Sequence, residues 1–546
     1  MKKFLSALTL ILALVMVATS CLAEADPFGK YEPAITLHFA RSTDDTLDAN
    51  YFSQYPDKTM TDNLWCDLYR EELGIIVDYD WIVKGGDEYD QKANIVIATG
   101  EIPEVMNVTA LQVKQLAEAG VIMPLDEIYD EYASPLTKEI MLETGTSPFD
   151  AATIDGKLYA LPNVDSTLML ADVIWIRTDW LEKLNLAVPT TTDELIAVAE
   201  AFCAADFDGN GVADTVGLGI SKELWAGLFG LRGFFNGFDS YPGIWVEDEN
   251  GQLVYGSTLP GTKDALAALH DMYEKGLIDR EFGVKDGGKV AESTTSGKCG
   301  IEIGAQWNSI WPLQSNFDLQ HESDGAQWQA FPIVSATGEP VKAQTAVGTT
   351  SWTVIRNDVE HPEAVVKLFN MFLAKNWGEG DINENGVYYA PLDSESIWKL
   401  SPVVPTKPDK NIDAFMQLEE YRKTGDESVV TGEGYSILKK LQAFENGGEG
   451  FAMWGWERIY GADGAYGVLA DYQENGMLQN NMFVGAPTET MTSRMSTLED
   501  LQNEVFVKII LGEESIDAFD QFVKDFYTLG GTDITAEVNE WYSSVK

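Results

Sequence analysis

The chain has 546 residues, with 87 Asp and Glu against 37 Lys and Arg, which gives a formal net charge of −50. Nucleic acids are bound chiefly through Lys and Arg that replace their counterions, so this acidity argues against nucleic acid as a partner. Because 45% of the residues are hydrophobic, the chain is able to bury large cores and is not a disordered acidic protein; its length suggests two to four domains.

Residues 1–20 have the form of a secretory signal peptide, with two lysines followed by an apolar run that is too short for a stop-transfer helix. The next residues resemble the bacterial lipoprotein cleavage box, in which Cys21 becomes the lipid-modified first residue. Ala18 stands where that box usually has Leu. The alternative is ordinary cleavage after Ala23 or Ala25. In both cases we expect an exported protein, held at the cell surface as a lipoprotein or secreted.

The first part of the mature chain alternates between strand and helix patterns. Strands are predicted over residues 34–39, 75–81 and 105–108, and helices over residues 63–73 and 88–99. These elements predict a first lobe.

The best-marked helix covers residues 192–204. Thr191 and Glu194 have the spacing of a capping box, and apolar residues recur at i, i+3, i+4 and i+7. The other elements predicted in this part are a hairpin over 244–247 and 253–255, a helix over 263–275, a buried strand over 300–304, and a C-terminal helix that carries Phe519, Phe522, Val523 and Phe526 and ends at Gly530 and Gly531. This alternation is typical of an α/β fold with largely parallel sheets.

The remaining cysteines, Cys66, Cys203 and Cys299, are odd in number and widely spaced, so no disulfide framework and no Cys-rich metal site is predicted. The four histidines are also far apart in the sequence. A histidine-based zinc site or a catalytic dyad is therefore not indicated.

The most specific local signal is the acidic segment over residues 206–214. Oxygen side chains at positions 1, 3 and 5, a glycine at 6, a carbonyl at 7 and an acid at 9 follow the start of a calcium loop. The candidate ligands of a structural Ca²⁺ ion are Asp206, Asp208, Asn210, Val212 and Asp214. Gly217 replaces the usual Glu at position 12, which indicates a weaker site. The alternative is an Asx-rich loop that closes the preceding helix without metal.

Fifteen tryptophans are the other conspicuous feature. Sugars stack their apolar C–H faces on aromatic rings and bond their hydroxyls to polar side chains, so aromatic residues beside polar ones suit saccharide binding. The candidate contacts in such positions are Trp225, Trp307, Trp311, Trp454, Trp456 and Tyr460. For any single tryptophan the alternative is core packing.

Carboxylates are too abundant in this chain to nominate a catalytic pair. A glycosidase needs two carboxyl groups placed about 5 to 10 Å apart, one of them with a raised pKa, and no residue pattern here singles out such a pair. We therefore predict no catalytic residues and no enzyme.

Several motifs occur in a fixed order along the chain. Along the chain they include the segments 98–104 (ATGEIPE), 155–162 (DGKLYALP), 175–181 (WIRTDWL), 275–279 (KGLID), 361–364 (HPEA) and 537–542 (EVNEWY). In this order the chain resembles the extracellular solute-binding proteins of bacterial ABC importers, family 1, in the large subgroup that includes alginate-oligosaccharide-binding proteins.

The resemblance implies a two-lobed, periplasmic-binding-protein-like fold of type II, with a ligand cleft between the lobes. The N-terminal lobe would comprise residues 27–163 and 332–376. The C-terminal lobe would comprise residues 164–331 and 377–546.

The resemblance also implies roles for individual residues. Trp307 occupies the place where related sugar binders have a stacking tryptophan, and Asn163 and Asp165 lie at the crossover and should line the cleft. In some members the acidic loop binds calcium, and some of those have a Glu where this chain has Thr215, which again indicates weaker binding. With few basic residues in the chain, a neutral or lightly charged saccharide is expected.

By this resemblance the protein would be the exported, monomeric receptor of an ABC importer, which captures an oligosaccharide and presents it to a membrane permease. One alternative is a secreted carbohydrate-active enzyme. Another is the binding component of a sensory system.

Overall fold

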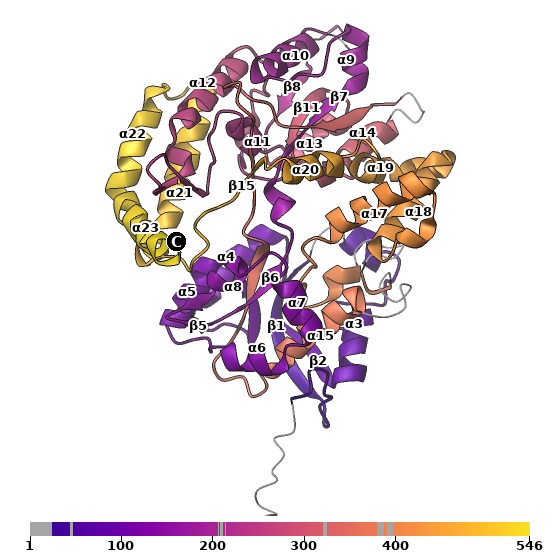
Figure 1. The fold of residues 1–546 in the computed structure, drawn as a ribbon, viewed down its shortest axis with the longest axis vertical. Coiled ribbons are helices and arrows are strands. Elements are labelled where there is room, and N and C mark those ends of the chain that lie inside the picture. Colours follow the sequence, from indigo (N-terminus) through magenta and orange to yellow (C-terminus); the bar gives the residue numbers. More distant parts are fainter. Residues whose placement is uncertain are drawn as a thin grey trace, which may run out of the picture.

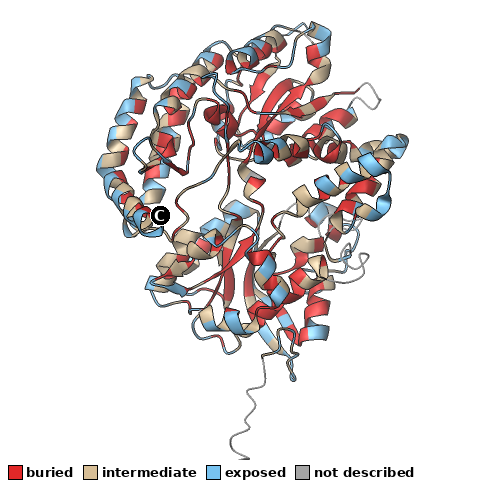
Figure 2. Cartoon of the chain, in the orientation of Figure 1, coloured by how far each residue is buried: buried red, intermediate tan, exposed pale blue. Residues whose placement is uncertain are grey.

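The computed structural model describes residues 25–43, 47–205, 207, 211–212, 214–319, 325–378, 387–389 and 397–546. The predicted signal peptide and the predicted lipidation site at Cys21 lie outside the described residues. The described chain forms two lobes, each with its own β-sheet and its own core of buried side chains (Figures 1 and 2). The predicted two-lobed α/β architecture is thus confirmed.

The first lobe is built on a sheet with the strand order β2-β1-β3-β14-β6. Its strands are β1 (Ile35–Thr43), β2 (Ile75–Lys84), β3 (Val105–Val108), β6 (Leu161–Val164) and β14 (Thr349–Ile355). β1 pairs in parallel with β2 and β3, whereas β14 is antiparallel to both β3 and β6. The sheet is mixed rather than largely parallel as predicted, because the chain returns from the second lobe before it forms β14.

The helices of the first lobe contribute buried side chains to the same core as this sheet. They are α3 (Leu64–Leu68), α4 (Gly86–Thr99), α5 (Ala110–Glu118), α6 (Asp126–Tyr132), α7 (Pro135–Met141), α8 (Ser147–Asp150) and α15 (Glu363–Trp377), and the short strands β4 (Thr153–Ile154) and β5 (Lys157–Leu158) form a hairpin beside them. α15 is buried over most of its length and packs against α6 and α7. It is the central helix of this lobe.

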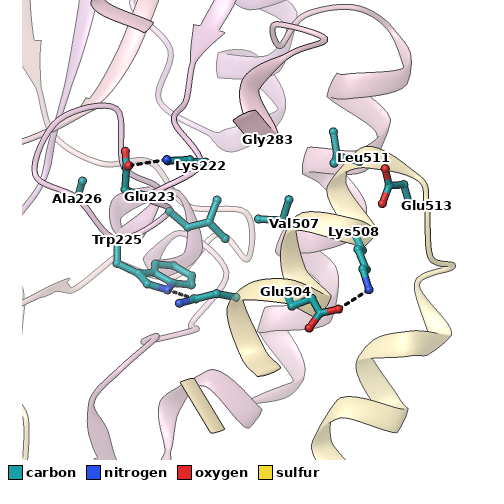
Figure 3. A pocket seen from close by; sticks show the side chains of 12 residues that line it. Lys222, Glu223, Trp225, Ala226, Gly283, Glu504, Val507, Lys508, Leu511 and Glu513 are labelled. Atoms are coloured by element: carbon teal, nitrogen blue, oxygen red, sulfur yellow. Dashed lines mark hydrogen bonds and ion pairs between the residues drawn. The ribbon is translucent and has the colours of Figure 1, made fainter. Parts of the chain in front are cut away.

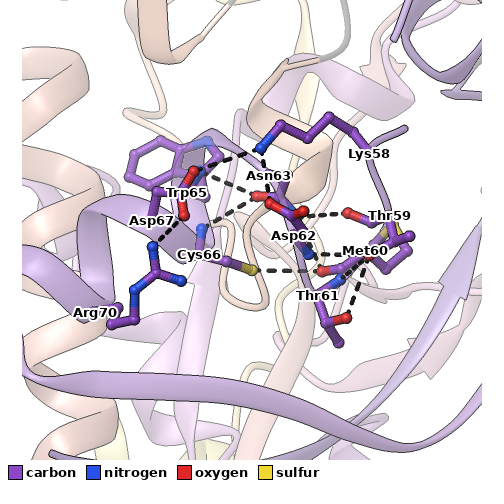
Figure 4. A network of polar contacts seen from close by, with 10 residues as sticks. All are labelled: Lys58, Thr59, Met60, Thr61, Asp62, Asn63, Trp65, Cys66, Asp67 and Arg70. Carbon is purple, nitrogen blue, oxygen red and sulfur yellow. Dashed lines mark hydrogen bonds and ion pairs between the residues drawn. The ribbon is translucent and has the colours of Figure 1, made fainter. Parts of the chain in front are cut away.

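An asparagine caps the N-terminus of α3 (Figure 4). The Asn63 Oδ1 atom accepts hydrogen bonds from the backbone N–H groups of Trp65 and Cys66 at 3.0 and 3.1 Å. Such a cap satisfies amide groups that have no partner inside the helix. The helix predicted over residues 63–73 forms, with its second half as a π-helix, and ends at Gly74, whose φ of +65° is easily adopted by glycine.

The second lobe is built on a four-stranded sheet with the order β12-β7-β11-β8. Its strands are β7 (Val173–Arg177), β8 (Val216–Gly219), β11 (Cys299–Gly304) and β12 (Trp328–Phe331). β7 is antiparallel to both of its neighbours, and only β11 and β8 are parallel. This sheet is therefore mixed as well, with Trp175, Trp180 and Trp328 fully buried in its core.

Most of the described helices belong to the second lobe. They are α9 (Thr178–Leu184), α10 (Thr192–Ala204), α11 (Arg232–Asn236), α12 (Pro260–Glu274), α13 (Gly287–Thr295), α14 (Leu313–Leu319), α17 (Lys410–Thr424), α18 (Glu433–Glu445), α19 (Trp454–Tyr460), α20 (Ala465–Glu474), α21 (Glu489–Leu511), α22 (Asp517–Phe526) and α23 (Thr532–Val545). Short strand pairs are formed by β9 (Trp245–Glu247) with β10 (Leu253–Tyr255), and by β13 (Ala343–Gln344) with β15 (Leu478–Gln479). In Figure 1, α21 to α23 lie along one side of the molecule and α17 and α18 along the other.

The helix predicted over residues 192–204 has the same bounds in the structure. The Thr191 hydroxyl accepts from the Glu194 amide at 3.2 Å, but the Glu194 carboxylate accepts from the amide of Thr190, at 2.8 Å, and not from that of Thr191. The predicted capping box is therefore half formed.

The C-terminal aromatic residues behave as the spacing predicted. Phe519, Phe522 and Phe526 are buried on α22. The helix ends at Phe526, earlier than predicted, and a π-helical turn with φ +144° at Gly530 leads into α23. Only glycine adopts this φ without strain, so Gly530 turns the chain between the last two helices.

The chain passes between the lobes more than once. Ile397, Leu400 and Val403 pack in the first core although helices of the second lobe follow them, and the Thr406 amide donates to the Val164 carbonyl at 2.8 Å. The Lys114 Nζ atom of α5 donates to the Pro487 carbonyl at 2.8 Å, just before α21. The lobes are thus tied at several points.

Among the described helices, none is both long and apolar enough to span a bilayer.

Candidate ligand-binding site

Strand direction decides which ends of the two sheets meet. β6 leaves the first sheet at its C-terminal end and leads to the first residue of β7. β8 and β11 run opposite to β7, so their last residues lie beside its first. The C-terminal ends of β6, β8 and β11 therefore border the crossing between the lobes. We call the segments 163–165, 220–227 and 305–311, which lie at or directly after these ends, the interlobe surface.

Asn163 lies buried at the end of the first sheet, where its side chain holds neighbouring strands together. It is fully buried, and its Nδ2 atom lies within hydrogen-bonding distance of Asn107 Oδ1, Ser351 Oγ and Thr353 Oγ1, at 3.1 to 3.2 Å. These partners come from β3 and β14, so one amide ties three strands of the first sheet together. The predicted site residue Asn163 thus supports the end of the sheet.

Asp165 is the first residue after the sheet and is half-buried. Its carboxylate accepts from the Ser166 amide at 2.8 Å, and its own amide donates to the Gly348 carbonyl at 2.9 Å. Burial raises the pKa of Asp165, although the Ser166 hydrogen bond and the charge of Lys410 oppose the shift. The structure therefore brings Asp165 close to a lysine of the second lobe.

That lysine forms an ion pair that the sequence analysis missed. The Lys410 Nζ atom lies 2.8 Å from Glu433 Oε2 and 4.9 Å from the centre of the Tyr389 ring. The two charged side chains are only 10% and 18% exposed. Burial is the largest single effect and lowers the pKa of Lys410, but the charge and hydrogen bond of Glu433 together with the neighbouring tyrosines outweigh it and raise the pKa. No sequence signal joins these residues, because they lie in different elements.

Trp307 lies in the short 3₁₀ turn Gln306–Ser309 and is half-buried. The Ala305 amide donates to the Gly227 carbonyl at 2.7 Å, and a Cβ atom placed on Gly227 would lie 3.4 Å from the Trp307 indole. The loops after β8 and β11 are therefore in contact at Trp307. Trp311 follows on the same loop with its side chain 42% exposed.

A row of aromatic rings extends from this turn. The Gln306 Nε2 atom donates to the Tyr466 hydroxyl at 3.4 Å, and Tyr466 stacks on Tyr460 with 5.0 Å between ring centres. Trp456 stacks on Tyr460 in turn, at 6.1 Å. The Lys440 Nζ atom lies 3.4 Å from the centre of the Trp456 ring. Two of the predicted site residues, Trp456 and Tyr460, thus belong to one stack that begins beside Trp307.

Trp454 has a different environment. It is fully buried and stacks on Phe317 at 5.0 Å with an angle of 11° between the rings. Trp454 and Trp456 are two residues apart on one helix, which places them about 200° apart around its axis. The structure therefore places Trp454 in the core, where it supports α19 rather than the interlobe surface.

Trp225 lies at a groove of about 640 Å³ beside the interlobe surface (Figure 3). Its Nε1 atom donates to Asn503 Oδ1 at 2.7 Å, and its ring packs against Phe235 and Phe506 of the core. The groove runs between the 222–226 loop and α21, with Leu224, Val507 and Leu511 as apolar lining and the pairs Lys222–Glu223 and Glu504–Lys508 along its sides. Its volume is in the range of small-molecule pockets.

The predicted calcium loop is described only in part. Asp206, Asp208 and Asn210 lie outside the described residues. Gly211 has φ +76°, as the sharp turn at position 6 of a calcium loop requires. Asp214 Oδ2 lies 2.5 Å from the Nζ atom of Lys298. Within the described part of the chain there is no group of three or more His, Cys, Asp or Glu residues suited to a metal ion.

Comparison with known sequences gives consistent matches. The family described as bacterial extracellular solute-binding protein matches residues 58–378. Lipoprotein LipO of Bacillus subtilis (strain 168) is 25% identical over 474 residues, which are 84% of this chain and 85% of LipO. The fructooligosaccharide ABC transporter substrate-binding protein FusA of Streptococcus pneumoniae serotype 4 (strain ATCC BAA-334 / TIGR4) is 28% identical over 266 residues, which are 46% of this chain and 48% of FusA.

Solved structures show the same fold. The alginate-binding protein AlgQ2, in a crystal structure without calcium ion, matches with a TM-score of 0.63 over 95% of this chain and all of AlgQ2, at 15% sequence identity. A likeness at this level of identity concerns the fold alone. It confirms the predicted periplasmic-binding-protein-like architecture.

Proposed function

The chain belongs to the bacterial extracellular solute-binding proteins, and from this premise we propose that it captures an oligosaccharide between its lobes and delivers it to the permease of an ABC importer. The observation that carries the proposal is the interlobe surface, where the turn with Trp307 follows a strand end that borders the crossing and the Asn163 network shapes the end of the other sheet. Aromatic faces beside polar groups suit a sugar, which has apolar C–H faces and a rim of hydroxyls.

The named relatives support a binding role. FusA is a fructooligosaccharide ABC transporter substrate-binding protein. In the proposed role no bond is made or broken, so the protein is a receptor and not an enzyme. We propose that Trp307, Trp311, Trp456 and Asp165 contact the sugar, with Tyr460, Trp225 and Asn163 around them, while Trp454 acts from the core.

The charges at the site favour a neutral or lightly charged saccharide. Lys410 is paired with Glu433, and Lys440 lies on the Trp456 ring. The Arg41 Nη2 atom at the end of β1 donates to the Lys399 carbonyl at 2.5 Å. Since these cations already have partners in the protein, an anionic sugar would find few groups to balance its charge.

Binding between lobes requires that the ligand prefer the closed state. A ligand shifts such an equilibrium only by its difference in affinity for the two states, and contacts to both lobes supply a few kcal/mol. We propose lobes of residues 27–163 with 332–376 and of residues 164–331 with 377–546, with the segment 397–403 packed on the first lobe.

We further propose that the mature protein is a monomer held at the cell surface through a lipid on Cys21. The lipoprotein LipO supports this localisation. Mass spectrometry of the membrane-associated protein tests it. A mature N-terminus at Cys21 with an added diacylglyceryl mass is expected, whereas an unmodified N-terminus after Ala23 or Ala25 would show a secreted protein.

Titration with a panel of plant, algal and host oligosaccharides tests the central proposal. We expect saturable stabilisation of the mature protein without new products, because a ligand that binds only the folded state raises its stability by about 2.7 kcal/mol at a hundredfold excess over Kd. Thermal shift and tryptophan fluorescence measure binding, and chromatography of the same samples detects cleavage. Cleavage products would instead identify a secreted carbohydrate-active enzyme.

We also propose that the loop over residues 206–214 holds a structural Ca²⁺ ion. The ligands would be the side chains of Asp206, Asp208, Asn210 and Asp214 with the Val212 carbonyl, and Gly211 has the turn conformation that such a loop needs. A bound ion would supply the positive charge that lets several carboxylates lie close together. Lys298, now beside Asp214, would give up this contact to the ion.

Removal of calcium should therefore lower the melting temperature. Chelation by EGTA is expected to reduce it by several degrees in the wild type, and added Ca²⁺, but not Mg²⁺, to restore it. In Asp208→Asn the response should be absent or shifted to higher Ca²⁺ concentrations. Equal melting curves with Ca²⁺ and with chelator would show that the loop needs no metal.

A further inference from the structure

A buried carboxyl group lies directly behind the turn that carries Trp307. Glu302, on β11, is fully buried, and within the described part of the chain neither of its carboxylate oxygens has a hydrogen-bond partner. The side chain of Asn308 in the Gln306–Ser309 turn is also fully buried, and its amide oxygen and nitrogen likewise have no partner there. Two complementary polar side chains are thus enclosed together.

The backbone places these side chains on the same side of the strand. Residues two apart in a strand point to the same face, so Glu302 and Gly304 share one face of β11. A Cβ atom on Gly304 would lie 2.6 Å from Asn308 Nδ2. The Asn308 amide therefore covers the face of the strand from which the Glu302 side chain projects, and it lies close enough to influence the pKa of that carboxyl.

Among the described residues, no cation lowers the pKa of Glu302. Burial raises the pKa of its carboxyl to about 8, and only the Asn308 amide opposes this. In the described part of the chain, Glu302 interacts with the Cys299 thiol, whose pKa burial raises to about 12 with a contribution from Glu302. The partners across the strand are Trp175 on β7 and Gly219 on β8, which carry no charge. Burial of an unpaired charge is costly, so the neutral acid is the stable form.

We propose that the neutral Glu302 carboxyl is the positioning residue for Trp307: its O–H donates to the Asn308 carbonyl oxygen, the Asn308 amide donates back, and this pair holds the Gln306–Ser309 turn. Only the protonated acid offers a donor, so ionisation removes one of the two hydrogen bonds. The pair therefore makes the position of Trp307 depend on pH. The importance of this positioning for sugar binding rests on the proposed function of Trp307. The pH dependence of the ring position does not rest on that function.

The test needs no ligand. Mature protein labelled with 5-fluorotryptophan is titrated from pH 6 to pH 10 by ¹⁹F NMR, with the Trp307 resonance assigned through Trp307→Phe. In the wild type we expect this resonance to shift with a midpoint near pH 8. In Glu302→Gln, a neutral isostere that keeps both hydrogen bonds, it should keep the low-pH position throughout. Cys299→Ser is the control and should titrate like the wild type.

Stability gives a second, independent readout. The folded-state pKa of Glu302 is raised above its unfolded value, so its contribution to stability is complete at low pH and is lost as the pH rises towards 8. The melting temperature of the wild type should therefore fall more steeply between pH 5 and pH 8 than that of Glu302→Gln. A Trp307 resonance that does not titrate, or that titrates equally in Glu302→Gln, would overturn the proposal. Failure of sugar binding in the oligosaccharide panel would not affect either measurement.

Discussion

Trp307→Ala is expected to weaken binding of the captured oligosaccharide at least about 100-fold, or about 2.7 kcal/mol. The indole lies on the loop after β11, in contact with the loop after β8, and is half-buried. Its loss removes an aromatic face of the interlobe surface, and Tyr460 is not able to replace it because that ring is buried within its own stack. Isothermal titration calorimetry with a saccharide that binds the wild type measures the change.

A matched control separates loss of the contact from loss of the fold. The control residue is Phe28, whose side chain is 38% exposed. It lies in the N-terminal segment that precedes β1, far in the sequence from the segments of the interlobe surface. Phe28→Ala should bind like the wild type. Trp307→Ala should keep its circular dichroism spectrum and unfold cooperatively. Unchanged affinity in a folded Trp307→Ala protein would remove this residue from the ligand site.

Glu433→Gln should lower the free energy of unfolding by about 3 kcal/mol. The Lys410 ammonium lies 2.8 Å from Glu433 Oε2 and both side chains are largely buried. Removal of one partner of a buried pair leaves an uncompensated charge, which typically costs 3 to 5 kcal/mol. Lys410 would keep its hydrogen bond to Asn411 and the Tyr389 ring, which places the expected loss at the lower end of this range. Urea unfolding followed by fluorescence measures the loss.

An exposed pair of the same type provides the control. Lys289 and Glu292 lie 2.8 Å apart on α13, but their side chains are 63% and 69% exposed. Glu292→Gln should change stability by less than about 1 kcal/mol, because solvent screens surface ion pairs. Equal effects of the two substitutions would mean that burial does not strengthen the Lys410–Glu433 interaction.

The elements with strong local signals were predicted well. β3 and α10 have the bounds that their patterns predict, because a short buried strand and an amphipathic helix are determined by nearby residues. The helix over residues 63–73 was also predicted, although its π-helical half was not. The direction of β14 was not predictable in this way, since it depends on the lobe from which the chain returns.

The site was predictable only in its parts. Trp307 stands at the end of a predicted strand, and the structure places it at the interlobe surface. Trp454 and Trp456 looked equivalent in the sequence, but the helix turns one into the core and the other towards the aromatic stack. Lys410, Glu433 and Glu302 carried no signal, because burial and charge pairing across elements are not local properties.

The sequence by itself determined the acidic character of the chain, the α/β alternation, the best-capped helices and the family to which it belongs, since all of these follow from residue type and short-range spacing. The tertiary structure alone decided which strand ends border the crossing between the lobes, which tryptophans remain near the surface and which carboxyl groups lose their solvent. The physical reason is that these properties depend on contacts between residues far apart in the chain, whose solvent exposure and charge partners are set only when the two sheets and their helices pack.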